Sequence, residues 1–382
     1  MNREGVGVPS FPTVEAAIEA LGKKERFEPS DLYPRDGTLE LARLEARVAN
    51  LVGVDEGKLY LFTCGMSAVV AALEVASPTG GTVIAHGNQL YSQSTKYLSE
   101  KLPQRDVKVV SFDSGSVDEI DRTIQRHRPQ IIFVETVANA PGVNVLDLEG
   151  FLNLDSLTQL DPVIILDNTL PTPTTLPLAD ILRRHPRNLI AVESGTKFYS
   201  LNQELSGLIY SEDKELMHKL RVTRRMVGSQ LSSSAVQMMG ETIPVTKEAF
   251  DRRNRLILSN TYRLAQACEV AVRESSEFSV SHPNLQTHSN YDYASRRFPD
   301  GASPLFFVVS NGRLDQFDLA RRMWEREDIR EYCDLGQSFG CDRTRIWPDA
   351  QFPAIRISGG TEEPEEVAKI AEGFRKALSH VV

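Results

Sequence analysis

The chain has 382 residues, of which 41% are hydrophobic and 25% are charged, and its formal net charge is −9 at neutral pH. This length favours one large domain joined to a smaller one, and it is sufficient to bury a deep site. An acidic chain without a basic stretch is poorly suited to nucleic-acid phosphates or an acidic membrane surface, so we expect neither nucleic acid nor membrane as a partner.

The amino terminus and the cysteines exclude further classes of protein. Residues 1–10 contain no apolar secretion segment, and no stretch approaches the roughly 18 apolar residues of a membrane span. We therefore expect a cytoplasmic protein. The cysteines at 64, 268, 333 and 341 form no CxxC pair and have no histidine-rich neighbourhood, so we expect free thiols and no metal site.

From about residue 58 to residue 210, short apolar runs alternate with longer stretches of helical period. Strands are predicted at 81–85, 107–112, 130–135, 163–167, 189–192 and 207–210. Runs that are apolar throughout and separated by helices indicate a largely parallel sheet that is covered on both faces. In such an α/β sheet, ligands bind outside the carboxyl ends of the strands.

The last third of the chain predicts a smaller α/β domain. Residues 213–275 contain no convincing strand and end in a candidate long helix over 246–274. Strands are then predicted at 305–310 and 354–358, and helices at 314–325 and 364–378. We divide the chain into an N-terminal arm that contacts a neighbouring subunit (1–45), a large domain (46–250) and a small C-terminal domain (251–382).

Two candidate catalytic residues follow neighbouring predicted strands of the large sheet. Asp167 ends one apolar run, and Lys197 lies just past the next run in the Ser-Gly-Thr-Lys segment 194–197. A lysine can hold pyridoxal 5′-phosphate (PLP) covalently, and a carboxylate can keep the ring nitrogen of this cofactor protonated. The alternative for Lys197 alone is a solvated lysine at a strand end.

A PLP site also needs partners for the phosphate. Gly65 and Met66 lie in a turn before the helix-period stretch 68–76, where backbone N–H groups and the helix dipole favour an anion. Ser194 and Thr196 offer hydroxyls beside the lysine for the same phosphate. The alternative for residues 65 and 66 is a plain strand-to-helix turn.

The ring of PLP needs three further contacts. Asp167 would pair with the pyridinium nitrogen, so that the ring withdraws electrons from the substrate Cα. Tyr91 is expected to stack on the ring face, and Asn139 is expected to hydrogen-bond the phenolic oxygen. The alternatives are a half-buried aromatic at a helix start for Tyr91 and a loop-capping amide for Asn139.

Taken together, these residues resemble the Cys/Met-metabolism family of PLP enzymes, which includes cystathionine γ-synthase, cystathionine γ-lyase and methionine γ-lyase. The likeness covers nearly the whole chain and follows the order of the family's motifs, which read here as Tyr33-Pro-Arg35-Asp-Gly37, Cys64-Gly65-Met66-Ser67, Tyr91 to Ser94, Glu135 to Pro141, Asp167-Asn168-Thr169, Ser194 to Lys197, Ser338-Phe339-Gly340 and Arg356 to Gly360. The resemblance implies the type I fold of PLP-dependent transferases, in which a large, mostly parallel sheet domain precedes a smaller C-terminal α/β domain.

The resemblance also implies roles for residues. Tyr33 and Arg35 would bind the phosphate of an adjacent subunit, which makes a homodimer the minimum active unit and a homotetramer the expected assembly. Ser338 would contact the substrate, and Arg356 would clamp its carboxylate, because a planar guanidinium offers two parallel hydrogen bonds. Tyr91 would accept the substrate amine proton or assist the leaving group.

Near the substrate, the chain departs from the family. After the lysine, the usual Gly-His-Ser-Asp run is replaced by Leu-Asn-Gln-Glu at 201–204. Arg343 stands where several members have a glutamate, which would suit an anionic leaving group or nucleophile. The segment 347–353 is also shorter than usual. These departures leave the substrate open.

The reaction that we expect is γ-replacement on an activated homoserine-type amino acid, which forms a thioether as cystathionine γ-synthase does. The alternative reaction is γ-elimination from cystathionine, methionine or a related amino acid. An inactive PLP-fold scaffold or regulator is an alternative of another class. In a non-PLP α/β enzyme, the remaining alternative, Lys197 and Asp167 would be structural.

Overall fold

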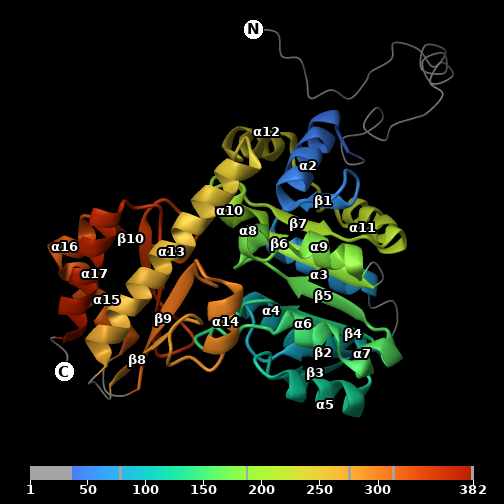
Figure 1. Ribbon diagram of the computed structural model, residues 1–382. Helices are drawn as coiled ribbons and strands as arrows, with labels where there is room; N and C mark the ends of the chain where they lie inside the picture. The colour runs from blue at the N-terminus through green and yellow to red at the C-terminus, as the bar shows by residue number, and fades with distance from the viewer. Residues whose placement is uncertain (1–36, 77–79, 186–187, 274–276, 312–314, 380–382) are drawn as a thin grey trace, which may run out of the picture.

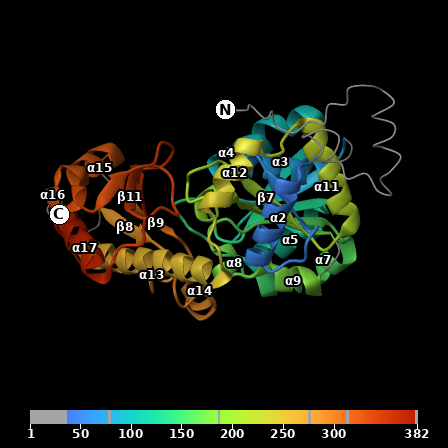
Figure 2. The same ribbon diagram turned by 90° about the horizontal axis from the view of Figure 1, so that it is seen from above.

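The structure, a computed structural model, describes residues 37–76, 80–185, 188–273, 277–311 and 315–379. The chain forms two lobes that lie side by side, and the long helix α13 (Lys247–Val272) runs from one lobe to the other (Figures 1 and 2). The predicted phosphate ligands Tyr33 and Arg35 lie outside the described residues.

The larger lobe is built on a seven-stranded sheet in the order β1-β7-β6-β5-β4-β2-β3. Its strands are β1 (Leu59–Phe62), β2 (Val83–Gly87), β3 (Lys108–Phe112), β4 (Ile131–Glu135), β5 (Val163–Asp167), β6 (Leu189–Ser194) and β7 (Gly207–Tyr210). Strands β2 to β6 pair in parallel, whereas β7 is antiparallel to both β6 and β1. The prediction of a largely parallel sheet is confirmed. It missed β1, which has only four residues and lies at the sheet edge.

Helices cover both faces of this sheet. They are α2 (Leu39–Val52), α3 (Gly65–Ala76), α4 (Ser92–Lys96), η3 (Tyr97–Lys101), η4 (Pro103–Arg105), α5 (Val117–His127), α6 (Leu148–Leu152), α7 (Asp155–Leu160), α8 (Thr172–Thr175), α9 (Leu178–Arg184), α10 (Gly195–Phe198), α11 (Lys214–Val227) and α12 (Ser233–Thr242). Successive residues of β4 point to opposite faces, so Ile132 and Val134 join one apolar cluster while Ile131 and Phe133 join the other. Burial on both sides explains the uniformly apolar strands of the sequence.

The smaller lobe contains a five-stranded sheet in the order β10-β11-β12-β9-β8. Its elements are β8 (Phe278–Ser281), α14 (Tyr291–Arg297), β9 (Leu305–Ser310), α15 (Gln316–Glu325), α16 (Glu327–Arg330), β10 (Cys333–Leu335), β11 (Thr344–Pro348), β12 (Ala354–Ser358) and α17 (Pro364–Ser379). The smaller α/β lobe was predicted, but only β9 and β12 of its strands were found from the sequence. The predicted division at residue 250 falls within α13 and stays a prediction.

Part of the predicted N-terminal arm packs on its own chain. Residues 39–45 belong to α2, which begins after Thr38, whose side chain accepts a hydrogen bond from the Leu41 amide at 3.1 Å. The side chains of Leu41 and Leu44 are buried in the core of the larger lobe. Contact of the arm with a neighbouring subunit remains a prediction for the residues before α2.

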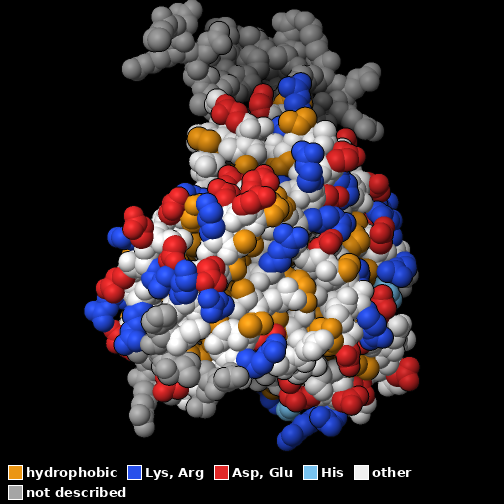
Figure 3. Space-filling model, turned by 60° about the vertical axis from the view of Figure 1, so that its left-hand side comes forward, with side chains coloured by type: hydrophobic (Ala, Val, Ile, Leu, Met, Phe, Trp, Pro, Cys, Tyr) orange, Lys and Arg blue, Asp and Glu red, His pale blue; other side chains and the backbone are white. Residues whose placement is uncertain are grey.

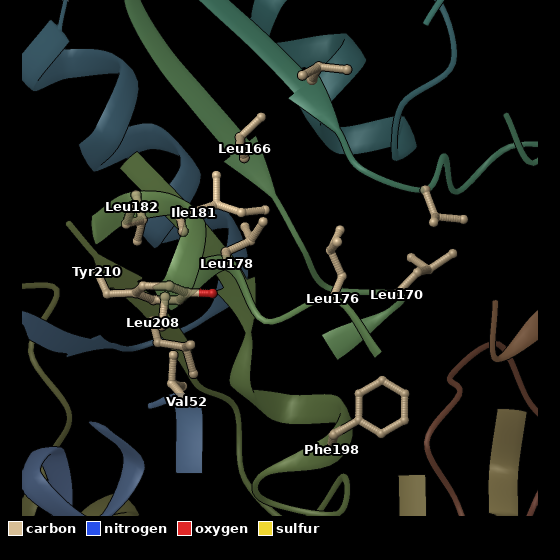
Figure 4. Close-up of a cluster of buried hydrophobic side chains, with 14 of the residues drawn as sticks. Val52, Leu166, Leu170, Leu176, Leu178, Ile181, Leu182, Phe198, Leu208 and Tyr210 are labelled. Carbon is tan, nitrogen blue, oxygen red and sulfur yellow. The ribbon is translucent and has the colours of Figure 1, made fainter. Parts of the chain in front are cut away.

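Buried apolar side chains fix the strand ends that carry the candidate site. Figure 4 shows Leu166 of β5 close to the α9 residues Ile181 and Leu182. Leu208 and Tyr210 of β7 belong to the same buried apolar cluster. Because interiors pack at crystal-like density, residues that follow these strands are held on a rigid base.

The described helices include none that is long and apolar enough to cross a membrane. The described residues also contain no group of three or more His, Cys, Asp or Glu arranged to hold a metal ion. On the face shown in Figure 3, basic and acidic side chains are interspersed.

Candidate active site

A cavity of about 280 Å³ lies at the carboxyl ends of β4, β5 and β6, where the two lobes meet. The larger lobe supplies its lining from segments 64–66, 91–94, 135–139, 167–170 and 194–197, while the smaller lobe supplies residues 337–339 and Arg356. The cavity is therefore at the edge of the sheet where the α/β topology predicts a ligand.

Most of the predicted site residues meet in this cavity. Its lining includes Gly65, Met66, Tyr91, Asn139, Asp167, Ser194, Thr196, Lys197, Ser338 and Arg356. Arg343 is absent from the described lining, and Tyr33 and Arg35 cannot be placed because they lie outside the described residues.

Lys197 extends from α10, the single helical turn that follows β6. Its Nζ donates a hydrogen bond to Ser338 Oγ at 2.8 Å and lies 5.3 Å from the centre of the Phe339 ring. Burial, together with the nearby Arg356 guanidinium, lowers the pKa of Lys197 to about 8. The unprotonated amine that a nucleophile or general base requires is therefore formed at much lower pH than in an ordinary lysine.

Asp167 presents one oxygen to the cavity side. Its Oδ1 accepts hydrogen bonds from the Thr169 amide at 3.0 Å and from the Thr169 hydroxyl at 2.5 Å. Its Oδ2 has no hydrogen bond within the described residues, so it can accept one from a ring N–H. Thr169 was quoted in the sequence only as part of a motif, but it orients the carboxylate.

Glu135 is a second buried carboxylate beside Asp167, and no role was predicted for it from the sequence. The two residues are direct neighbours in the register of β4 and β5. Burial raises the pKa of both carboxyl groups, and the charge of Asp167 raises that of Glu135 further. A cation bound at Asp167 would relieve this repulsion, which fits a protonated pyridine ring.

Glu135 also holds two of the predicted ring contacts. Its Oε1 accepts from the Tyr91 amide at 2.6 Å, and its Oε2 accepts from the Asn139 amide at 2.8 Å. The side-chain oxygen of Asn139 is buried without a hydrogen-bond partner within the described residues. The side-chain amide of Asn139 is therefore free to bind a ligand, and its NH₂ group can donate to a phenolic oxygen.

The turn before α3 fits a phosphate group. A Cβ added to Gly65 would lie 3.0 Å from the Ser194 Cβ, so glycine allows these two segments to approach closely. The amides of Gly65 and Met66 are at the start of a 12-residue helix, where they have no acceptor within the helix. Ser194 Oγ also has no partner within the described part of the chain.

Thr196, predicted as a phosphate ligand, lines the cavity and also bonds to a neighbouring segment. Its hydroxyl donates to the Ser206 carbonyl at 3.2 Å and accepts from the Ser206 amide at 3.0 Å. These bonds fix the segment that carries the lysine. A phosphate contact would require the Thr196 hydroxyl proton to turn away from Ser206, so this contact stays a prediction.

Arg356 on β12 is 8% exposed and lines the cavity opposite the lysine segment. Among the described residues it has no hydrogen bond or ion pair. An arginine stays charged even when it is buried, so this guanidinium is free to bind a carboxylate through two parallel hydrogen bonds.

Arg343 does not approach the cavity. Its guanidinium forms an ion pair with Asp334 of β10 at 3.1 Å and donates to the Glu331 carbonyl at 2.8 Å. The expected contact of Arg343 with the substrate or leaving group is therefore not supported. β10 was absent from the predicted elements, so the partner that draws this side chain away could not be foreseen.

A third buried carboxylate, Glu193, links neighbouring segments of the larger lobe through hydrogen bonds. Glu193 accepts hydrogen bonds from the hydroxyls of Tyr199 at 2.7 Å and Tyr210 at 2.6 Å. Burial raises the pKa of Glu193 to about 7, although these hydrogen bonds oppose the shift. Because Glu193 precedes Ser194, this network holds the end of β6 from which Lys197 extends.

Comparisons with known proteins agree with this geometry. Residues 10–346 match the sequence profile of the family described as Cys/Met metabolism PLP-dependent enzyme. A cystathionine beta-lyase of Neurospora crassa is 22% identical over 98% of this chain and 77% of its own length. An L-methionine gamma-lyase of Fusobacterium nucleatum subsp. nucleatum is 24% identical over 90% of this chain and 80% of its own length.

Solved structures share the fold. A cystathionine gamma synthase of Xanthomonas oryzae pv. oryzae, in complex with aminoacrylate and cysteine, has a TM-score of 0.77 and 18% identity, covering 95% of this chain and 91% of that one. A putative O-acetylhomoserine (thiol)-lyase of Campylobacter jejuni, with N′-pyridoxyl-lysine-5′-monophosphate, has a TM-score of 0.75 and 18% identity over 97% and 92% of the two chains. The match over residues 10–346 shows that the chain, whose cavity contains a lysine, a buried carboxylate and the start of a helix, belongs to the Cys/Met metabolism family of PLP-dependent enzymes.

Proposed function

We propose that this enzyme catalyses γ-replacement on an activated homoserine-type amino acid, with a thiol as the nucleophile and a thioether as the product. The observation that carries the proposal is the pairing of Arg356, buried and without a partner in the described residues, with Lys197, whose pKa is lowered to about 8, in one cavity. The first can bind an α-carboxylate, and the second can move protons at the adjacent carbons.

Bound PLP supplies an electron-withdrawing ring that makes the substrate protons at Cα and Cβ acidic. The residues proposed to hold it are Asp167 at the ring nitrogen, Tyr91 on the ring face, Asn139 at the phenolic oxygen, and Ser194 with the start of α3 at the phosphate.

Lys197 is the proposed proton carrier. The two carboxylates of the lining have other partners, because Glu135 accepts two backbone amides, and Asp167 accepts from Thr169 and is proposed to face the ring nitrogen. The lysine amine is thus the base best placed to remove protons from two neighbouring substrate carbons. Tyr91 is 37% exposed and lines the cavity, where its phenol can accept the amine proton of an incoming substrate or donate one to a leaving group.

The known relatives support related reactions. Replacement is favoured because the proteins that share the fold include a cystathionine gamma synthase, solved in two complexes, and a putative O-acetylhomoserine (thiol)-lyase. Elimination is the second candidate because the curated relatives are a cystathionine beta-lyase and an L-methionine gamma-lyase.

A substrate panel tests the proposal. O-acetylhomoserine, O-succinylhomoserine, O-phosphohomoserine, cystathionine and methionine are each offered with and without cysteine, and both keto acid and thioether are measured. We expect thioether from one of the activated homoserines only when cysteine is present. Keto acid from cystathionine or methionine without added thiol would instead identify a lyase, and cofactor absorbance without any turnover would favour a scaffold.

We also propose a cytoplasmic homo-oligomer, a dimer at least and a tetramer by resemblance, in which Tyr33 and Arg35 reach the phosphate of a neighbouring subunit. Light scattering of the purified protein tests the assembly. An active monomer would exclude this role for the two residues.

A further inference from the structure

The loop after Lys197, where the chain departs from its family, reaches the lysine through Asn202. Leu201 and Asn202 have φ values of +52° and +61°, so two successive residues without a glycine adopt the left-handed conformation. This conformation is costly for most side chains and is best tolerated by asparagine. The amide of Asn202 donates to the Thr196 carbonyl at 2.8 Å, which closes the loop against the lysine segment.

The orientation of the Asn202 side chain is set by its partners. Its Nδ2 lies 3.0 Å from the Phe339 carbonyl oxygen and 3.3 Å from the Cys341 sulfur. A carbonyl oxygen only accepts hydrogen bonds, so the NH₂ end of the amide must face Phe339. The Oδ1 end therefore faces Ser338, whose hydroxyl donates to it.

This chain of hydrogen bonds determines how Ser338 meets Lys197. A serine hydroxyl has one proton, and here Asn202 Oδ1 accepts it. Ser338 Oγ can then only accept from the lysine, as the 2.8 Å contact allows. The lone pair of an unprotonated Lys197 is consequently left pointing away from Ser338. Without Asn202, the serine proton could turn to that lone pair and occupy it.

We propose that Asn202 is a positioning residue that fixes the Ser338 proton and so keeps the lone pair of the free Lys197 available. It acts through Ser338 and touches neither cofactor nor substrate. Its contribution applies whenever Nζ is free, both when PLP first attaches and when substrate has taken its place. The inference depends on membership of the PLP family and holds for either replacement or elimination.

The attachment of PLP to the cofactor-free protein tests this without a substrate. The rate is followed by the visible absorbance of lysine-bound PLP across pH, because attachment requires the lysine lone pair. Asn202→Gly removes the side-chain amide, and glycine readily adopts the same left-handed backbone conformation. Gln203→Ala is the matched control, since residue 203 is exposed in the same loop. We expect Asn202→Gly to slow attachment roughly fivefold, the effect of one neutral hydrogen bond, and the control to attach PLP at the parent rate.

A variant of Ser338 separates the positioning role of Asn202 from general damage to the loop. With Ser338→Ala there is no proton to misdirect, so adding Asn202→Gly should have no further effect on the rate. Equal slowing by Asn202→Gly in both backgrounds, or an unchanged rate in the single variant, would overturn the proposal.

Asn202→Asp tolerates the same backbone and keeps an oxygen that accepts the Ser338 proton, but its second oxygen faces the Phe339 carbonyl oxygen that Nδ2 contacts at 3.0 Å in the parent protein. The informative quantity for this variant is therefore the position of its attachment profile on the pH axis and not its height. The profile should move to higher pH, because a carboxylate near Lys197 favours the ammonium form. Arg356, Cys341 and Arg345 also act on the charge of this lysine and are unchanged between the variants. A profile that stays at the parent pH would contradict the inference.

Discussion

Substitution of Glu135 by glutamine should weaken cofactor binding although Glu135 is not expected to touch the cofactor. The two carboxylate oxygens each accept one amide N–H, from Tyr91 at 2.6 Å and from Asn139 at 2.8 Å. Glutamine has the same shape but offers one acceptor and one NH₂ donor. One of the two amides would therefore face a donor, and the segment that carries it would have to move.

The expected size follows from these contacts. A buried N–H that loses its acceptor costs about 1–3 kcal/mol. If that cost appears in the PLP-bound form, affinity falls by roughly five- to 150-fold, since about 1.4 kcal/mol corresponds to a factor of ten. Removal of the charge beside Asp167 stabilises mainly the cofactor-free protein, where no pyridinium is present to offset the repulsion. Both effects act in the same direction.

The assay is a titration of cofactor-free protein with PLP, followed by absorbance, for wild type, Glu135→Gln and Tyr91→Phe. The tyrosine variant keeps its backbone amide and hence the hydrogen bond to Glu135, so it reports the loss of the phenol hydroxyl alone. Glu135→Gln should bind PLP more weakly than Tyr91→Phe. Wild-type affinity in Glu135→Gln, with normal thermal stability, would refute the assignment of Glu135 as the support of the Tyr91 and Asn139 segments.

Four further results are expected. Lys197→Ala should lose the visible band of covalently held PLP while staying folded, and a remaining band would show that another lysine holds the cofactor. For wild type, the rate of PLP attachment should rise with pH around a midpoint near 8, because the pKa of Lys197 is lowered to about 8 and the amine is protonated below it; a midpoint near 10.5 would contradict the burial of its ammonium. Arg356→Met should raise KM for the amino-acid substrate at least tenfold, the scale of a charge-assisted pair, whereas Arg343→Met should leave KM unchanged. Arg224 forms a largely buried ion pair with Glu45 at 2.5 Å. Arg224→Met should lower the free energy of unfolding by about 3 kcal/mol in a denaturant titration, because the Glu45 carboxylate loses this partner. An unchanged midpoint would argue against a stabilising role of the pair.

The larger lobe was predictable from the sequence because its signals are local. Each parallel strand is an apolar run, and Asp167 and Lys197 can be placed at one edge of the sheet from the ends of two such runs. Thr196 shows what local signals do not reveal. Its hydroxyl type predicts a phosphate ligand, whereas its two hydrogen bonds with Ser206, ten residues later in the chain, could not be foreseen.

The smaller lobe was harder because its strands carry mixed patterns. In β11, buried Thr344 and Ile346 alternate with Arg345 and the partly exposed Trp347, and the strand ends at a proline. Five residues of this kind give no clear strand signal. Because β11 and its neighbour β10 were not predicted, the orientation of Arg343 toward Asp334 could not be predicted either.

This difference between the lobes explains why the cofactor could be inferred more firmly than the substrate. The proposed PLP contacts come from the strand ends and turns of the larger lobe, whereas the smaller lobe brings Ser338 and Arg356 to the cavity through long-range packing. Arg253 of α13 reinforces that placement, since it donates to the Gly340 carbonyl at 3.1 Å and to Asp342 at 2.7 Å. Substitutions that loosen this contact should therefore change KM for the amino acid more than the absorbance of bound PLP, because they move the substrate side of the cavity relative to the cofactor contacts of the larger lobe.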